Sequence, residues 1–293
     1  MPADTSKNIL NLEKRTVQMR ALRLIEYSSK FLDLLDHPHI DGGKAYYISN
    51  ITNTPSTEDK QGILPSEIKP SKAIQQIVPL DQVVVFRDVI NENIMALSLD
   101  RQKEFTETVV AGMFAQYAQI IDKKIIDLLS DENNYNNDAV RKFDKTIFEE
   151  LNEKKNSDNL INKILTDIDF LLNPSKNNNK VGELANTSDE NNVIWAVDTK
   201  TFNLIRRKYL TPMAQPKYGD FIEPLRGVVR CPDLPNNAKW ALFDYRFVAA
   251  PYNTNDYTEW YYGLDKCTYL RLKGEYGIAA IESAPATLTV ANA

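Results

Sequence analysis

The segment from Asp100 to Leu129 carries an uninterrupted helical pattern, and it constrains the fold more than any other part of the chain. At ~1.5 Å per residue, a helix over this segment would be about 45 Å long. Apolar residues recur at steps of three or four, as expected for one buried face; they are Phe105, Val109, Val110, Met113, Phe114, Tyr117, Ile120, Ile121, Ile125 and Leu128. We therefore predict one long helix on which the domain is assembled. Small residues predict close approach of another element along it; they are Ala111, Gly112, Ala115 and Ala118.

The sequence ahead of this helix has strand and loop character. Residues 42–79 contain alternating apolar residues in AYYISNI and again in SKAIQQIVP, with a polar stretch between them that is punctuated by prolines and a glycine. Two strand patterns joined by a long polar connection predict an extended hairpin that projects from the body. The following run, QVVVFRDVI (82–90), is rich in β-branched residues and predicts a buried strand.

The sequence after the helix divides into a polar part and a β-rich part. Residues 130–192 contain asparagine clusters, which predict turns, around two helical patterns, KTIFEEL and NLINKILTDIDFLLN. VIWAVDTKTFNLIRRKYL predicts a buried strand from Val193, then a short helix capped by Asp198 or Thr199. From VVRCPDLP to ATLTVA the patterns predict strands.

Residues 7–35 carry apolar side chains at helical spacing and an excess of Lys and Arg. We interpret them as an amphipathic helix with a solvated cationic face. The alternative is an arm that contacts a neighbouring subunit, a scaffold or enclosed nucleic acid. We expect this segment to lie outside the body, so that removal of residues 1–35 would alter the size or nucleic-acid content of the assembly more than the fold.

Composition excludes several classes of protein. A net charge of −5 over 293 residues argues against a protein whose whole surface binds nucleic acid, which would need a basic excess. No apolar run approaches the ~20 residues that span a bilayer, so we expect no membrane segment. The start, MPADTSKNILNLEKRT, lacks the layout of a signal peptide, and we expect a cytoplasmic location.

No motif for catalysis is present. GxGxxG, GxxxxGK[ST], HExxH and GxSxG are all missing. The only histidines, His37 and His39, lie in DHPHID, where the intervening proline favours a turn over a zinc site built with Asp36 and Asp41. Two cysteines about 36 positions apart, Cys231 and Cys267, are interpreted as reduced core residues, the alternative being a disulfide.

The remaining candidates also have a structural interpretation. The carboxylate pairs Asp167 with Asp169 and Glu149 with Glu150 are typical of solvated helix faces. The basic run 206–208 is interpreted as a charged helix face rather than a nucleic-acid contact, and the aromatic run 260–262 as core or subunit contact rather than a sugar or base site. We therefore expect no enzyme, and no catalytic, cofactor-binding or metal-binding residue.

The order of segments resembles the tailed-phage major capsid proteins of the Hong Kong 97 fold, which encapsulin shells share. The stretches FAQYAQIIDKKIIDLL, VIWAVDTKTFNLIRRKYL and VVRCPDLPNNAKWALFDYRF look like the family's spine helix, axial-domain unit and axial loop with its return. The resemblance implies an α+β capsid fold with five parts: an N-terminal arm (1–41), an extended hairpin or E-loop (42–79), a peripheral strand and spine helix (80–130), an axial domain (131–250), and a return to the peripheral sheet (251–293). The polar stretch 130–192 is longer than this pattern requires.

The resemblance also implies a function. A major capsid protein would assemble through pentamers and hexamers into an icosahedral shell around viral double-stranded DNA, in a virion made in the host cytoplasm, with scaffold, portal and decoration proteins as further partners. The hairpin would lie across an adjacent subunit through residues such as Ile63, Leu64 and Ile68. Some relatives crosslink subunits through lysine, for which Lys60, Lys69 and Lys72 are candidates by location only. The alternatives are an encapsulin-like compartment, another phage structural protein, a soluble enzyme and a peptide- or nucleic-acid-binding module.

Overall fold

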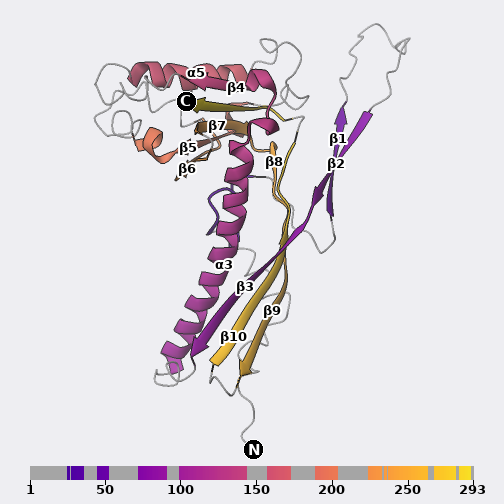
Figure 1. Cartoon of the computed structure of the whole chain (residues 1–293), viewed down its shortest axis with the longest axis vertical. Coiled ribbons are helices and arrows are strands. Elements are labelled where there is room, and N and C mark those ends of the chain that lie inside the picture. Colours follow the sequence, from indigo (N-terminus) through magenta and orange to yellow (C-terminus); the bar gives the residue numbers. More distant parts are fainter. Residues whose placement is uncertain are drawn as a thin grey trace, which may run out of the picture.

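The long helix and three extended strands run side by side and form the lower half of the molecule in Figure 1. The computed structural model describes residues 25–26, 28–35, 45–52, 72–90, 99–143, 157–172, 189–203, 224–232, 234–235, 237–262, 267–281 and 284–291. Helix α3 (Leu99–Ser130) confirms the predicted long helix. It packs along two strands of a three-stranded antiparallel sheet whose order is β3-β10-β9, where β3 is Asp81–Ile90, β9 is Tyr252–Tyr262 and β10 is Cys267–Tyr276.

The predicted buried face of α3 is present. Met113, Tyr117, Ile121 and Ile125 are fully buried, whereas Gln119 is exposed. The expectation of close approach at the small residues is wrong at Gly112, which is exposed, and a Cβ placed there would meet no atom within 4 Å.

Side chains that follow α3 satisfy its terminal carbonyls. The Asn134 amide donates to the Leu128 carbonyl at 2.9 Å, and the Tyr135 hydroxyl donates to the Leu129 carbonyl at 2.8 Å. The last carbonyls of a helix have no partner inside it, so these contacts end α3 without leaving them unpaired. The asparagine cluster NNYNND (133–138) therefore forms a turn, as predicted, and it overlaps the short helices η2 (Glu132–Asn134) and η3 (Asn137–Ala139).

A five-stranded mixed sheet lies at the far end of α3, in the upper left of Figure 1. Its order is β4-β12-β7-β5-β6, with bounds β4 Val140–Phe143, β5 Val193–Asp198, β6 Gly227–Cys231, β7 Ala238–Asp244 and β12 Ala286–Ala291. Helix α5 (Ser157–Leu172) covers one face, and the main core, which includes α3, covers the other. Alternate residues of β5 therefore enter different clusters: Trp195 packs with α5, and Ile194 packs with the main core.

The last strand is in a different sheet from the one predicted. We expected residues 251–293 to return together to one sheet, the peripheral sheet, but they divide between two sheets, and only β9 and β10 lie in a sheet with β3. β12 inserts between β4 and β7 in the five-stranded sheet. Alternation of apolar residues in ATLTVA specifies a strand but not its partner, and the partner depends on where β8 (Val248–Ala249) and β11 (Ala279–Ala280) direct the chain.

The short helix predicted after β5 is present over residues 199–203, where this described range of the chain ends. Asp198 caps it, because its carboxylate accepts hydrogen bonds from the backbone amides of Lys200 at 2.7 Å and Thr201 at 2.9 Å. Preceding β5 is the single turn η6 (Glu190–Asn192). The pattern KTIFEEL lies outside the described residues.

Candidate assembly elements and buried polar anchors

The predicted hairpin exists and projects from the body (Figure 1). Strands β1 (Ala45–Thr52) and β2 (Lys72–Pro79) pair antiparallel along their full length, in a sheet of their own. The connection 53–71 lies outside the described residues, together with Ile63, Leu64, Ile68, Lys60 and Lys69. Lys72 is the first residue of β2.

Alternate residues of β2 face opposite ways, so the base of the hairpin is anchored on one face only. Val78 is fully buried in the main core, and the Gln76 amide donates to the Ala280 carbonyl at 2.6 Å. Ile77, between them, is 58% exposed, and the register places it opposite Tyr47. One face thus fixes the hairpin to the body, while the other carries an exposed branched apolar side chain.

The N-terminal segment, meaning residues 25–26 and 28–35, corrects a prediction. We expected a helix through residue 35 that lies outside the body, but helical conformation ends by Ser28 and a turn follows. Ile25, Phe31, Leu32 and Leu35 are buried in the main core. The sequence shows that these apolar residues recur at helical spacing, but the strands that form the core around them are distant in the chain. Removal of residues 1–35 is therefore expected to damage the fold itself. Residues before 25 lie outside the described residues.

Asp122 holds this segment against α3. The Ser29 hydroxyl donates to Asp122 Oδ1 at 2.5 Å, and the Lys30 backbone amide donates to Oδ2 at 2.9 Å. The Ser29 oxygen in turn accepts from the amides of Phe31 and Leu32 at 3.1 and 3.0 Å. Burial raises the pKa of the Asp122 carboxyl, although its hydrogen bonds with Ser29 and Lys30 oppose that shift.

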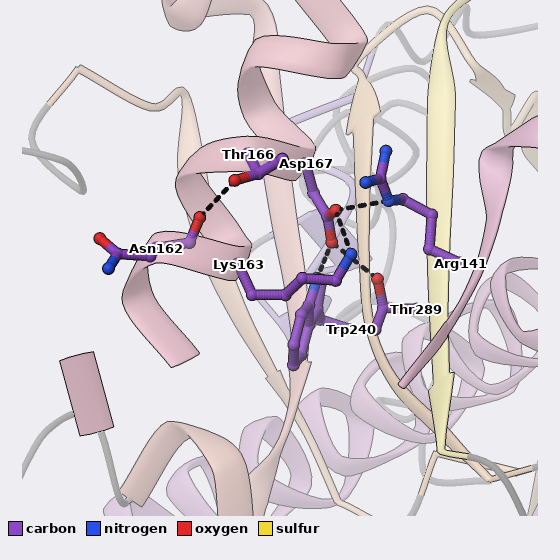
Figure 2. Close-up of polar contacts among 7 residues, drawn as sticks. All are labelled: Arg141, Asn162, Lys163, Thr166, Asp167, Trp240 and Thr289. Atoms are coloured by element: carbon purple, nitrogen blue, oxygen red, sulfur yellow. Dashed lines mark hydrogen bonds and ion pairs between the residues drawn. The ribbon is translucent and has the colours of Figure 1, made fainter. Parts of the chain in front are cut away.

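Asp167 is the centre of a second polar cluster, and the prediction that it lies on a solvated helix face is wrong. It belongs to α5 and is fully buried, and Figure 2 shows the partners of its carboxylate. Its Oδ1 pairs with Arg141 Nε at 2.8 Å and Lys163 Nζ at 3.2 Å, and its Oδ2 accepts from Trp240 Nε1 at 3.2 Å and Thr289 Oγ1 at 2.8 Å. Asp169, its supposed partner, is exposed.

The sources of these contacts explain why sequence reasoning missed the cluster. Arg141 comes from β4, Trp240 from β7 and Thr289 from β12, three strands far apart in the chain. Only Lys163, one helical turn away at i−4, could have been paired with Asp167 from the sequence. The cluster joins α5 to the sheet through one carboxylate with four partners, which makes it a structural anchor.

Among the remaining candidates, the structure describes the side chain of Cys231, which is not a reactive centre. Cys231 is a free buried thiol, as predicted, and burial raises its pKa to about 12, so it stays protonated and poorly nucleophilic. Residues 260–262 form the end of β9, with their side chains outside the described set. His37, His39, Asp36, Asp41, Glu149, Glu150 and the basic run 206–208 also lie outside it. Among the described residues, no group of three or more His, Cys, Asp or Glu could hold a metal ion.

Comparison with solved structures identifies the fold. The capsid of cyanophage P-SCSP1u aligns over 88% of this chain and 86% of that chain, with a TM-score of 0.58 at 10% identity. The capsid of Staphylococcus phage Andhra aligns over 88% and 83%, with a TM-score of 0.56 at 10% identity. A structure from Mycobacterium phage Bobi aligns over 90% and 91%, with a TM-score of 0.53 at 14% identity.

These alignments cover between 83% and 91% of the chains on both sides, so the similarity concerns the fold of most of the chain. No family model matches the sequence, and no curated protein matches it significantly. The chain has the Hong Kong 97-like fold of tailed-phage capsid proteins, as its segment order predicted. Within the part that the structure describes, no helix has the length and apolarity needed to cross a membrane.

Proposed function

We propose that this chain is a major capsid protein that self-assembles into an icosahedral shell, and that it acts as a structural protein rather than an enzyme. The fold supports this proposal, and the observation that carries it is the hairpin. A two-stranded sheet alone is marginally stable in water, yet β1 and β2 project from the body and expose Ile77. A neighbouring copy of the chain would cover that face.

The contents and partners of the shell follow from the same proposal. The shell would enclose double-stranded DNA, and the net charge of the chain supports this content, because a value of −5 limits adhesion to phosphates. Pentamers and hexamers would be the assembly units, with scaffold, portal and decoration proteins binding to them in a virion formed in the host cytoplasm.

The test uses two substitutions of exposed apolar residues. Ile77→Lys changes the hairpin, and Leu165→Lys changes the outer side of α5, where the leucine is 41% exposed. Neither side chain is part of the core, so both variants should keep the circular dichroism spectrum of the wild type. Sedimentation velocity and negative-stain imaging would then measure assembly.

We expect wild-type protein and Leu165→Lys to form closed shells or rings of five or six subunits, and Ile77→Lys to remain smaller. Deleting residues 56–71 should have the same effect as Ile77→Lys. A wild-type chain that stays monomeric or dimeric at high concentration with its scaffold would contradict the shell proposal. Normal shells from Ile77→Lys would contradict the role of the hairpin face.

A further inference from the structure

The N-terminal segment contacts three separate parts of the molecule through polar groups. Toward the three-stranded sheet, the Tyr252 hydroxyl donates to Glu26 Oε1 at 2.8 Å. Toward α3, Ser29 and Lys30 bind Asp122. Toward the five-stranded sheet, Arg226 Nε donates to the Leu34 carbonyl at 2.5 Å. The segment is therefore tied to both sheets and to the helix between them.

The contact with the five-stranded sheet is close as well as polar. A Cβ added to Gly227, the first residue of β6, would lie 2.6 Å from a methyl carbon of Leu34. A larger residue at position 227 would require the Leu34 methyl groups to move away from the backbone of β6. The Arg226 guanidinium also stacks on the Tyr245 ring, 4.3 Å from its centroid, which fixes the arginine whose Nε holds Leu34.

Within the described strands, the three-stranded and five-stranded sheets share no strand pairing, so their relative placement depends on packing in the main core and on chain connections. Apolar packing alone is not directional. Hydrogen bonds of defined geometry at three points would add the missing direction, because all three are satisfied together at one arrangement of the two sheets.

We propose that the N-terminal segment is a clamp that fixes the angle between the five-stranded sheet and the unit formed by α3 and the three-stranded sheet. When the clamp is closed, Leu34 lies against Gly227 and Ser29 binds Asp122; when it opens, the two sheets can rotate about the end of α3. In a shell this angle would set the shape of the subunit, a consequence that rests on the proposed function, whereas the clamp itself does not.

The test follows the angle through a distance between one site on each of the two sheets. Spin labels attached through a non-canonical amino acid at Gln82 of β3 and at Lys200 after β5, both exposed, report on the two parts without using either cysteine. Labelled protein is diluted with unlabelled chain so that pulsed electron resonance measures only distances within one subunit.

Two variants weaken different ends of the clamp. Ser29→Ala removes the hydroxyl that binds Asp122, and Arg226→Met removes the donor to Leu34 while keeping an apolar stem. Ser28→Ala and Arg230→Met are the matched controls, because they make the same chemical changes one and four residues away. Arg226 and Arg230 are both exposed, so neither arginine variant should unfold the chain.

We expect a narrow distance distribution in wild-type protein and both controls, and a broadened or two-component distribution in Ser29→Ala and Arg226→Met. Amide exchange over residues 28–35 should accelerate about tenfold in the same two variants. Faster exchange with an unchanged distance distribution would show a segment that is held but does not set the angle, and it would overturn the proposal. So would the absence of both effects. These outcomes do not depend on whether the chain forms shells.

Discussion

Tyr117 offers the sharpest test of how α3 is joined to the three-stranded sheet. Its side chain is fully buried, and its hydroxyl lies 3.0 Å from the Asn253 carbonyl and 2.9 Å from the Glu275 carbonyl. These two residues are opposite each other in β9 and β10, next to a shift in strand register. Burial raises the pKa of the phenol, so the hydroxyl remains a donor throughout the usual pH range.

Tyr117→Phe keeps the ring and removes only this donor. The buried Asn253 carbonyl and the partly buried Glu275 carbonyl would then lose their shared partner, which costs about 1–3 kcal/mol of unfolding free energy. For a chain of this size each kcal/mol corresponds to about 2–4 °C in melting temperature. Tyr117→Asp should cost more, because it removes the ring and buries a charge without a partner.

Denaturant unfolding and thermal melts at one protein concentration would measure the loss, with Gln119→Ala as the control on the exposed side of α3. Hydrogen exchange would show where the fold is weakened, because amides near Asn253 and Glu275 should exchange faster in Tyr117→Phe only. Equal unfolding free energies for Tyr117→Phe and Gln119→Ala would refute the argument, as would an exchange increase spread evenly over the chain.

Three further predictions concern charge and backbone space. Asp167→Asn should lower the unfolding free energy by about 3 kcal/mol, because it leaves buried cationic and polar partners without the carboxylate, whereas exposed Asp138→Asn should change it little; urea titrations measure both. The Asp122 carboxyl has a folded-state pKa above its ordinary 3.8, so the folded state binds its proton more tightly and this group stabilises the fold less as pH rises. The unfolding free energy of Asp122→Asn minus that of wild type should therefore increase from pH 3.8 upward. A flat or falling value of this difference would contradict the sign. Gly274→Ala should destabilise by about 1–3 kcal/mol, since its Cβ would lie 2.7 Å from a backbone oxygen, while exposed Gly112→Ala should stabilise by about 0.5–1 kcal/mol; equal melting temperatures would contradict both.

The elements predicted correctly are those that periodicity determines locally. The face of α3 follows from residues three and four apart, and the hairpin follows from two alternating runs with a polar connection between them. The capping role of Asp198 was also visible, because a cap acts on amides two and three residues away.

The errors concern partners that are distant in sequence. Asp167 resembles any acidic residue on a polar helix until β4, β7 and β12 bring four partners to it. Ile25 and Phe31 carried a helical pattern, but nothing local shows that strands more than a hundred residues away form the core around them. Tyr117 was placed on the correct face, yet its hydroxyl contacts depend on the irregular pairing of β9 and β10.

The arrangement of these contacts separates folding from assembly. Asp122, Asp167 and Tyr117 each join α3 or α5 to segments far away in the chain, and all three are buried, so substitutions there should lower stability before they alter any subunit contact. Ile77 has the opposite character, because it lies outside the core on a hairpin that is anchored from its other face. A substitution that reduces assembly at unchanged melting temperature should therefore map to the hairpin, and one that reduces both should map to the anchors. If hairpin substitutions lowered the melting temperature as much as anchor substitutions did, the hairpin would belong to the folded body. The exposed face of β2 would then have no role between subunits.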